Sequence, residues 1–172
     1  MNGHVILPGT PRDRFSLPLA TKRGTPIPNE RRLERPPDSL RAAVDFWAHE
    51  RPNARLRSVG ATYNCVGLVF ASRRTWVDPQ HVPLILEEDG YHEVPRHNRL
   101  QPGDVVIYRS DGGEITHIGI VLAAQPEVET ATWEVTVLSQ WGGDGEYIHA
   151  ADYIPHLLGR PSEYWSERRQ VP

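Results

Sequence analysis

The sequence contains one cysteine, Cys65, among its 172 residues. A single cysteine excludes a disulfide within the chain, and it also excludes a zinc site built on cysteines. Cys65 is therefore a free thiol that is either buried and inert or reactive. Because free cysteine is among the most buried residue types, an inert core position is the expectation that other features have to outweigh.

Long apolar runs and dense basic tracts are also missing. No stretch approaches the length of a membrane span, and the N-terminal residues lack the basic region and apolar stretch of a secretory signal. With 19 Lys and Arg against 22 Asp and Glu, the net charge of −3 does not suggest nucleic-acid binding. We expect a protein made in the cytoplasm, without membrane or nucleic-acid partners, whose export would require a specialised secretion system.

Prolines are concentrated near the N-terminus. Residues 1–37 combine them with polar residues and show no hydrophobic period, which predicts an extended arm. Residues 38–172 have a suitable length for a single domain with its own core. A first helix is predicted to begin with Asp38 as N-cap and to end at Pro52. Its apolar positions follow helical spacing: Leu40, Ala43, Val44 and Trp47.

A second helix is predicted at about residues 64–74, capped by Thr62 or Asn64, with Cys65 in its first turn. The first N–H groups of a helix are unpaired and favour negative charge, so this position favours a reactive thiolate. The expected buried face of this helix consists of Val66, Val69 and Phe70.

The rest of the chain predicts an antiparallel meander. Prolines and glycines interrupt residues 75–99, where we expect short elements that face a substrate. Alternating or β-branched runs then predict four strands, joined by turn sequences. The strands are expected at residues 105–108, 115–122, 133–141 and 146–149. Helices followed by such a meander indicate an α+β fold.

His117 lies near the start of the second predicted strand. Cysteine catalysis requires a base for the thiol proton and a third group that orients the imidazole. Cys65, His117 and the polar residues of the next strand provide these types in a coherent order. The order alone is moderate evidence, because the chain has eight histidines.

Three segments carry a resemblance to a known family: residues 63–69 (YNCVGLV), 100–106 (LQPGDVV) and 116–121 (THIGIV). In order and spacing they resemble the NlpC/P60 and CHAP-like cysteine hydrolase superfamily, which has a papain-like fold. Residues 139–142 (SQWG) look like the Ser-Lys-Trp-Gly-type motif of an uncharacterised bacterial branch. The resemblance covers about residues 60–160, and the order of cysteine before histidine indicates an unpermuted member.

The resemblance implies that Cys65 is the nucleophile, His117 the general base and acid, and a residue near Ser139 and Gln140 the orienting group. Gln140 is the first choice, because its carbonyl oxygen can accept the imidazole N–H. Strand alternation places Ser139 and Trp141 on the opposite face from Gln140, so only one set can face His117.

The remaining candidates are contacts to the oxyanion or the substrate. Tyr63 can donate its hydroxyl, although a half-buried packing role is the alternative, and the Cys65 N–H is a second donor. Asn64, Ser139 and Trp141 are the other candidate substrate contacts. Many family members have Asp-Cys-Ser-Gly where this chain has residues 64–67 (NCVG), so an amide replaces the carboxylate and an aliphatic side chain replaces the hydroxyl.

These residues predict a cysteine-dependent peptidase or amidase without a cofactor. By resemblance alone, the substrate class is peptides of the peptidoglycan type, and the biological role is an interbacterial toxin or cell-wall enzyme with an immunity or inhibitor protein as partner. No metal is predicted, because His81, His92 and His97 lack ligand spacing. The alternatives are a non-catalytic binding module on the same scaffold and a thiol-dependent acyl or amide transferase.

Overall fold

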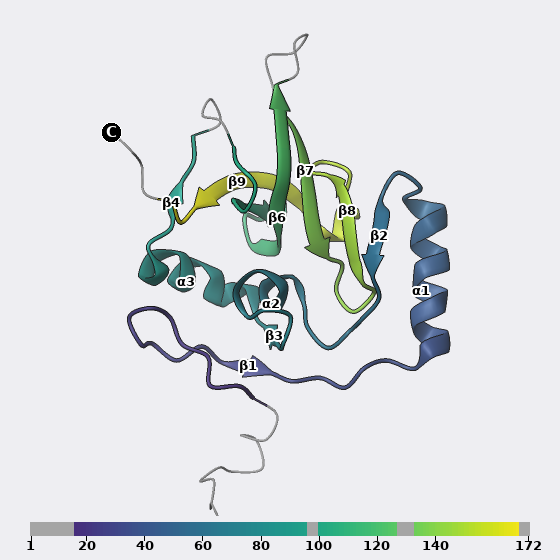
Figure 1. The fold of residues 1–172 in the computed structure, drawn as a ribbon, viewed down its shortest axis with the longest axis horizontal. Helices are drawn as coiled ribbons and strands as arrows, with labels where there is room; N and C mark the ends of the chain where they lie inside the picture. Colours follow the sequence, from purple (N-terminus) through teal and green to yellow (C-terminus); the bar gives the residue numbers. More distant parts are fainter. Residues whose placement is uncertain (1–15, 96–99, 127–132, 169–172) are drawn as a thin grey trace, which may run out of the picture.

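A main β-sheet with short helices packed against it makes up the described part of the chain (Figure 1). The computed structural model describes residues 16–95, 100–126 and 133–168. The helices are α1 (Pro37–Glu50), α2 (Cys65–Phe70) and α3 (Val82–Asp89), with 3-10 turns η2 (Pro79–His81) and η3 (His156–Leu158). The strands are β1 (Asn29–Glu30), β2 (Arg55–Ser58), β3 (Trp76–Val77), β4 (His92–Glu93), β5 (Val105–Arg109), β6 (Ile115–Pro126), β7 (Trp133–Gln140), β8 (Glu146–Ala150) and β9 (Arg160–Ser166).

Within these residues the main sheet has the order β2-β8-β7-β6-β5-β9-β4, and all of its pairs are antiparallel. Strands β5 to β8 form the predicted meander, because each pairs with the next along the chain. The α+β class predicted from the sequence is therefore confirmed.

Both outer parts of the sheet come from segments without a clear strand pattern. The segment of β2 shows no strand pattern in the sequence, but it pairs with β8 at the edge of the sheet. Strand β9, which was not predicted, pairs with β5 although it contains Pro161. Pairing with a neighbouring strand outweighs the weak local preference of these sequences.

Helix α1 differs from the prediction at its start. Pro36 is the N-cap residue and makes no side-chain cap, and Asp38 lies inside the first turn. The predicted apolar face is half-buried, and no residue of α1 is fully buried. Trp47 attaches the helix to the domain: its ring centroid lies 5.2 Å from that of Trp141, and its indole N–H donates to Asp144 at 2.8 Å.

Helix α2 is shorter than predicted. It ends at Phe70, and Ser72 and Arg73 follow with φ values of 50° and 64°, which a continuing helix does not allow. Asn64 is the N-cap, as expected, because its side chain accepts the N–H of Gly67 at 3.0 Å. A Cβ at Gly67 would lie 1.8 Å from the carbonyl oxygen of Thr75, so only glycine permits this close packing of α2.

The described part of the N-terminal arm, residues 16–36, runs alongside the domain from the region of β3 to α1 (Figure 1). Strand β1 pairs with β3, and the Asn29 side chain bonds to Leu17, Ile27 and Thr75. Residues 1–15, where the prediction of an arm also falls, lie outside the described residues. No described helix has the length and apolar character that a membrane crossing requires.

Candidate active site

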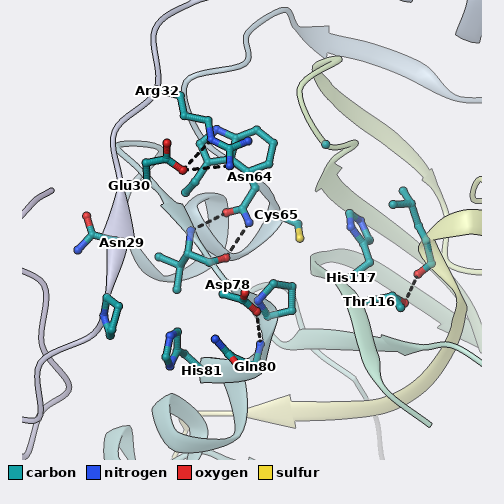
Figure 2. Close-up of a pocket in the computed structure, with 16 residues that line it drawn as sticks. Asn29, Glu30, Arg32, Asn64, Cys65, Asp78, Gln80, His81, Thr116 and His117 are labelled. Atoms are coloured by element: carbon teal, nitrogen blue, oxygen red, sulfur yellow. Dashed lines mark hydrogen bonds and ion pairs between the residues drawn. The ribbon is translucent and has the colours of Figure 1, made fainter. Parts of the chain in front are cut away.

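A cavity of about 570 Å³ lies where the arm, the start of α2, the segment after β3 and the start of β6 meet. Cys65 and His117 both line it, and Figure 2 shows the sulfur of Cys65 directed toward the side of the cavity that holds the imidazole. Asn64, from the same helix start, lines it as well. Of the site residues predicted from the sequence, these three are the ones that the structure brings together in the cavity.

Cys65 is buried, with 5% of its surface exposed. Burial raises the pKa of its thiol to about 11, although the backbone N–H groups of Ile118, Val66 and Cys65 itself act in the opposite direction. The expected lowering of the pKa at a helix start is therefore outweighed in this six-residue helix. The resting side chain is a neutral thiol, located next to the backbone of β6.

His117 is completely buried and pairs with Tyr108 of β5 in the sheet register. Burial lowers the pKa of its imidazole to about 3, and the charge of His149 adds to this effect. Neither ring nitrogen has a hydrogen-bond partner among the described residues. A neutral imidazole has one nitrogen able to accept a proton, but no hydrogen bond between His117 and the Cys65 thiol is among the described contacts.

Gln140 lies on the strand predicted for the orienting group, but its bonds go elsewhere. Its amide nitrogen donates to the carbonyl oxygens of Gly60 at 2.7 Å and Gly142 at 3.1 Å. It makes no described hydrogen bond with His117. Its position links the segment before Cys65 to the turn after β7, which is a structural function.

Ser139 and Trp141 lie on the other face of β7, as strand alternation predicted. The Ser139 hydroxyl lies 2.8 Å from Nε2 of His149, and the indole N–H of Trp141 donates to the same hydroxyl at 3.1 Å. His149 is buried, in keeping with a structural position. None of the three is among the residues that line the cavity.

Tyr63 is not directed into the cavity. Its hydroxyl donates to Glu146 at 2.6 Å, and Arg73 and Arg57 each donate to the same carboxylate at 2.5 Å. Glu146 thus connects the residues before and after α2, which fixes the helix that carries Cys65. The oxyanion function predicted for Tyr63 does not agree with this geometry, because its one O–H is already donated.

Glu146 is the residue that sequence reasoning missed. Its only sequence signal was an acidic residue at the start of the predicted strand at residues 146–149. A buried carboxylate requires paired donors, but nothing in the sequence indicated that this one is buried. Its donors, Arg57, Tyr63 and Arg73, come from β2 and from both sides of α2.

Asn64 is also occupied. Its amide nitrogen donates to the Val77 carbonyl at 2.7 Å, and its oxygen accepts the N–H groups of Gly67 and Val77 at 3.0 and 3.1 Å. The side chain therefore caps α2 and attaches it to β3. It has little capacity left for the substrate contact that was expected of it.

The outer wall of the cavity carries charged and aromatic groups. The guanidinium of Arg32 lies 3.9 Å from the ring centroid of Trp76 and forms an ion pair with Glu30 at 3.0 Å. Asp78 and His81, from the segment predicted to face a substrate, also line the cavity (Figure 2). Among the described residues, no group of three or more histidine, cysteine and acidic side chains is arranged to hold a metal ion.

No family model matches the chain, and the comparisons with curated proteins and with solved structures also give no match. The functional argument therefore depends on the residues and their geometry.

Proposed function

We propose that the protein is a cysteine-dependent amide hydrolase with Cys65 as nucleophile and His117 as general base and acid. The observation that carries the proposal is that Cys65 and His117 both line one cavity, while neither nitrogen of the buried imidazole has a described partner. A buried polar group without a partner is rare in native structures and calls for an explanation. A base that exchanges protons with a thiol and a substrate provides one.

The resting pair is neutral, so the proposed attack is assisted by general-base catalysis and does not start from a thiolate. The Cys65 sulfur bonds to the carbonyl carbon while its proton moves to His117. The amide C–N bond then breaks, and the leaving amine takes that proton from His117. Water next attacks the resulting thioester with His117 as base, the acid leaves, and the proton returns to the thiol.

Peptides of the peptidoglycan type remain the proposed substrate class, and a papain-like arrangement remains the proposed fold family. Both depend on the sequence resemblance described above. The proposed biological setting, an interbacterial toxin or cell-wall enzyme with an immunity protein, depends on the same resemblance.

The direct test is hydrolysis of cell-wall fragments and peptides by the wild-type protein, Cys65→Ala and His117→Leu. We expect both variants to lose activity. As a matched control, His156→Gln changes an exposed histidine outside the cavity and should retain activity. Unchanged hydrolysis by Cys65→Ala would end the proposal, and product analysis with added amines distinguishes hydrolysis from transfer to another acceptor.

A non-catalytic binding module is the second candidate. The observation that favours it is the burial of both groups, which raises the pKa of the Cys65 thiol to about 11 and lowers that of the His117 imidazole to about 3. Alkylation with iodoacetamide from pH 6 to pH 10 separates the two candidates. Catalysis requires that His117→Leu slow the reaction at neutral pH, whereas an inert thiol reacts at the same low rate in both proteins.

A further inference from the structure

A second cavity, of about 340 Å³, lies between α3, β5, β9 and the start of β6. Its volume is within the range of ligand pockets, about 300–1,000 Å³. Neither Cys65 nor His117 lines it, so it is distinct from the cavity described above. Apolar and aromatic side chains make up most of its lining: Pro83, Leu86, Tyr91, Ile107, Ile115 and Trp165.

The charged groups of this second cavity are largely paired with each other. Nε of Arg109 donates to Glu163 at 2.6 Å, and the indole N–H of Trp165 donates to the other oxygen of the same carboxylate at 3.0 Å. Arg109 also donates to the carbonyl oxygen of Gly113 at 2.7 Å. The third charged lining residue, Glu87, is exposed to solvent. Because the charges of Arg109 and Glu163 compensate each other, the cavity favours an uncharged occupant.

Both aromatic side chains of the lining are held in place without a ligand. The ring of Tyr91 packs edge to face against Phe70, with centroids 5.7 Å apart. The Trp165 indole is fixed by its hydrogen bond to Glu163. Ile107, another lining residue, is completely buried in the core. Such a preformed apolar cavity favours an apolar side chain, because the side chain leaves water and the protein does not have to become more ordered.

The second cavity adjoins the first. In the segment that the sequence predicted to face a substrate, His81 lines the first cavity and Pro83 lines the second. On β6, Thr116 lines the first cavity and Ile115 lines the second. The 3-10 turn η2 contacts β6, so these two pairs of residues form a common boundary. One extended chain that crosses this boundary reaches both cavities.

A β-bulge in β6 directs neighbouring residues to the two cavities. His117 pairs with Tyr108, but Ile115 pairs with Arg109, so β6 has one extra residue at Thr116. In a regular strand, residues 115 and 117 would point to the same side of the sheet. Bulges redirect side chains in this way and are frequent next to active sites. Here the bulge gives His117 to the first cavity and Ile115 to the second.

We propose that the second cavity is a subsite for a large apolar side chain, of the size of leucine or phenylalanine, in a peptide whose reacting amide lies in the Cys65 cavity. The inference rests on the proposed function, because a peptide held for attack by Cys65 is the molecule that extends across the boundary. It refines the substrate class by side-chain chemistry and does not use the family resemblance.

The test uses the single thiol of the chain, Cys65, as the point of attachment. Iodoacetyl peptides with zero to three glycines before a C-terminal phenylalanine, lysine or serine amide alkylate this thiol, and mass spectrometry at pH 9 gives the rate for each peptide. At one spacing, we expect the phenylalanine peptide to react about tenfold faster than the serine peptide of the same length, because its side chain is buried. The ratio of the two rates cancels the general reactivity of the thiol.

Variants of the second cavity locate the side chain of the peptide. Ile115→Trp should abolish the preference for phenylalanine, because the indole fills the cavity, and Tyr91→Ser should reduce it by removing an aromatic wall. As the matched control, Val59→Trp places the same indole at an exposed position outside both cavities and should keep the preference. Thermal unfolding identifies a variant that fails to fold, in which case the other cavity variant decides.

Three results would overturn the inference. They are equal rates for phenylalanine and serine peptides at every spacing in wild type, a preference that persists in both Ile115→Trp and Tyr91→Ser, and fastest reaction of the lysine peptides, which would indicate a cationic occupant attracted by Glu87. The hydrolysis test separates these results from failure of the proposed function. Hydrolysis that Cys65→Ala abolishes, without a phenylalanine preference, overturns the subsite alone. The preference without any hydrolysis leaves a peptide-binding site and ends the enzymatic proposal.

Discussion

Glu146 on β8 and His117 on β6 are both completely buried polar side chains of the same sheet, yet their surroundings differ. The Glu146 carboxylate accepts hydrogen bonds from Tyr63, Arg57 and Arg73. The His117 imidazole has no described hydrogen bond at either nitrogen. A paired buried group avoids the desolvation cost that an unpaired one incurs, and an unpaired one calls for an explanation.

The same contrast appears in how burial affects the two groups. Burial alone would raise the pKa of Glu146, but its hydrogen bonds to Arg73, Tyr63 and Arg57 outweigh burial and lower it. His117 has no such compensation, and burial lowers its pKa to about 3. The sheet therefore holds both a charged group that is compensated and a neutral group that is not.

Replacement of Glu146 with alanine should have the largest effect. It removes the acceptor shared by Tyr63 and two partly exposed arginines, and it leaves the buried Tyr63 hydroxyl without a partner, which costs about 1–3 kcal/mol. We expect urea denaturation to show a decrease of that size in the free energy of unfolding. Glu30→Ala breaks an exposed ion pair and serves as the control, with an expected change of about 1 kcal/mol or less.

If Glu146→Ala is no less stable than Glu30→Ala, Glu146 does not fix the ends of α2. A parallel measurement of Cys65 alkylation would show whether the loss of Glu146 also makes Cys65 on α2 more accessible.

The pH dependence of stability should distinguish the unpaired His117 from the paired Glu146. Its pKa falls from 6.5 to about 3 on folding, so between these values the unfolded chain binds a proton that the folded chain does not. Stability should therefore decrease as the pH falls from about 6.5 toward 3, by about 1 kcal/mol per pH unit. His117→Leu should remove this contribution and, at pH 7, leave the protein as stable as wild type or more stable.

Urea denaturation at pH 7 and pH 5 checks this prediction, with His156→Gln as a control at an exposed histidine. His149, whose pKa burial also lowers, leaves a smaller slope of the same sign in His117→Leu. Equal slopes in His117→Leu and wild type would show that His117 is not neutral and unpaired in the folded state.

The sequence predicted the parts of the fold that depend on local patterns. The β5–β8 meander was visible in β-branched and alternating runs, and the Asn64 cap was visible as a polar residue before an apolar helix. Strands β2 and β9 were not predicted, because their strand character depends on pairing with distant segments. The length of α2 depends on a change of backbone direction at Ser72, which has no strong local signal.

Of the predicted site residues, Cys65, Asn64 and His117 line the cavity, and no hydrogen bond joins Cys65 to His117 among the described contacts. Gln140 and Tyr63 use their polar groups elsewhere. A hydrogen bond depends on the position and direction of single atoms, and sequence spacing does not determine these. The alternation of Ser139 and Gln140 was predictable from the sequence. To decide which of these two residues lies on the same side of the sheet as His117, the register of β6 against β7 is needed.

Replacement of one arginine should have the smallest effect on the free energy of unfolding. It shows whether the remaining partners of Glu146 can compensate for the loss of one. Arg57 and Arg73 are each partly exposed, at 46% and 39% of their side-chain surfaces. Arg57→Gln leaves Arg73 and Tyr63 on the carboxylate, so we expect a loss of about 1 kcal/mol or less in urea denaturation. A loss as large as that of Glu146→Ala would mean that Arg57 alone compensates the buried charge, and the contrast with His117 would then depend on one ion pair.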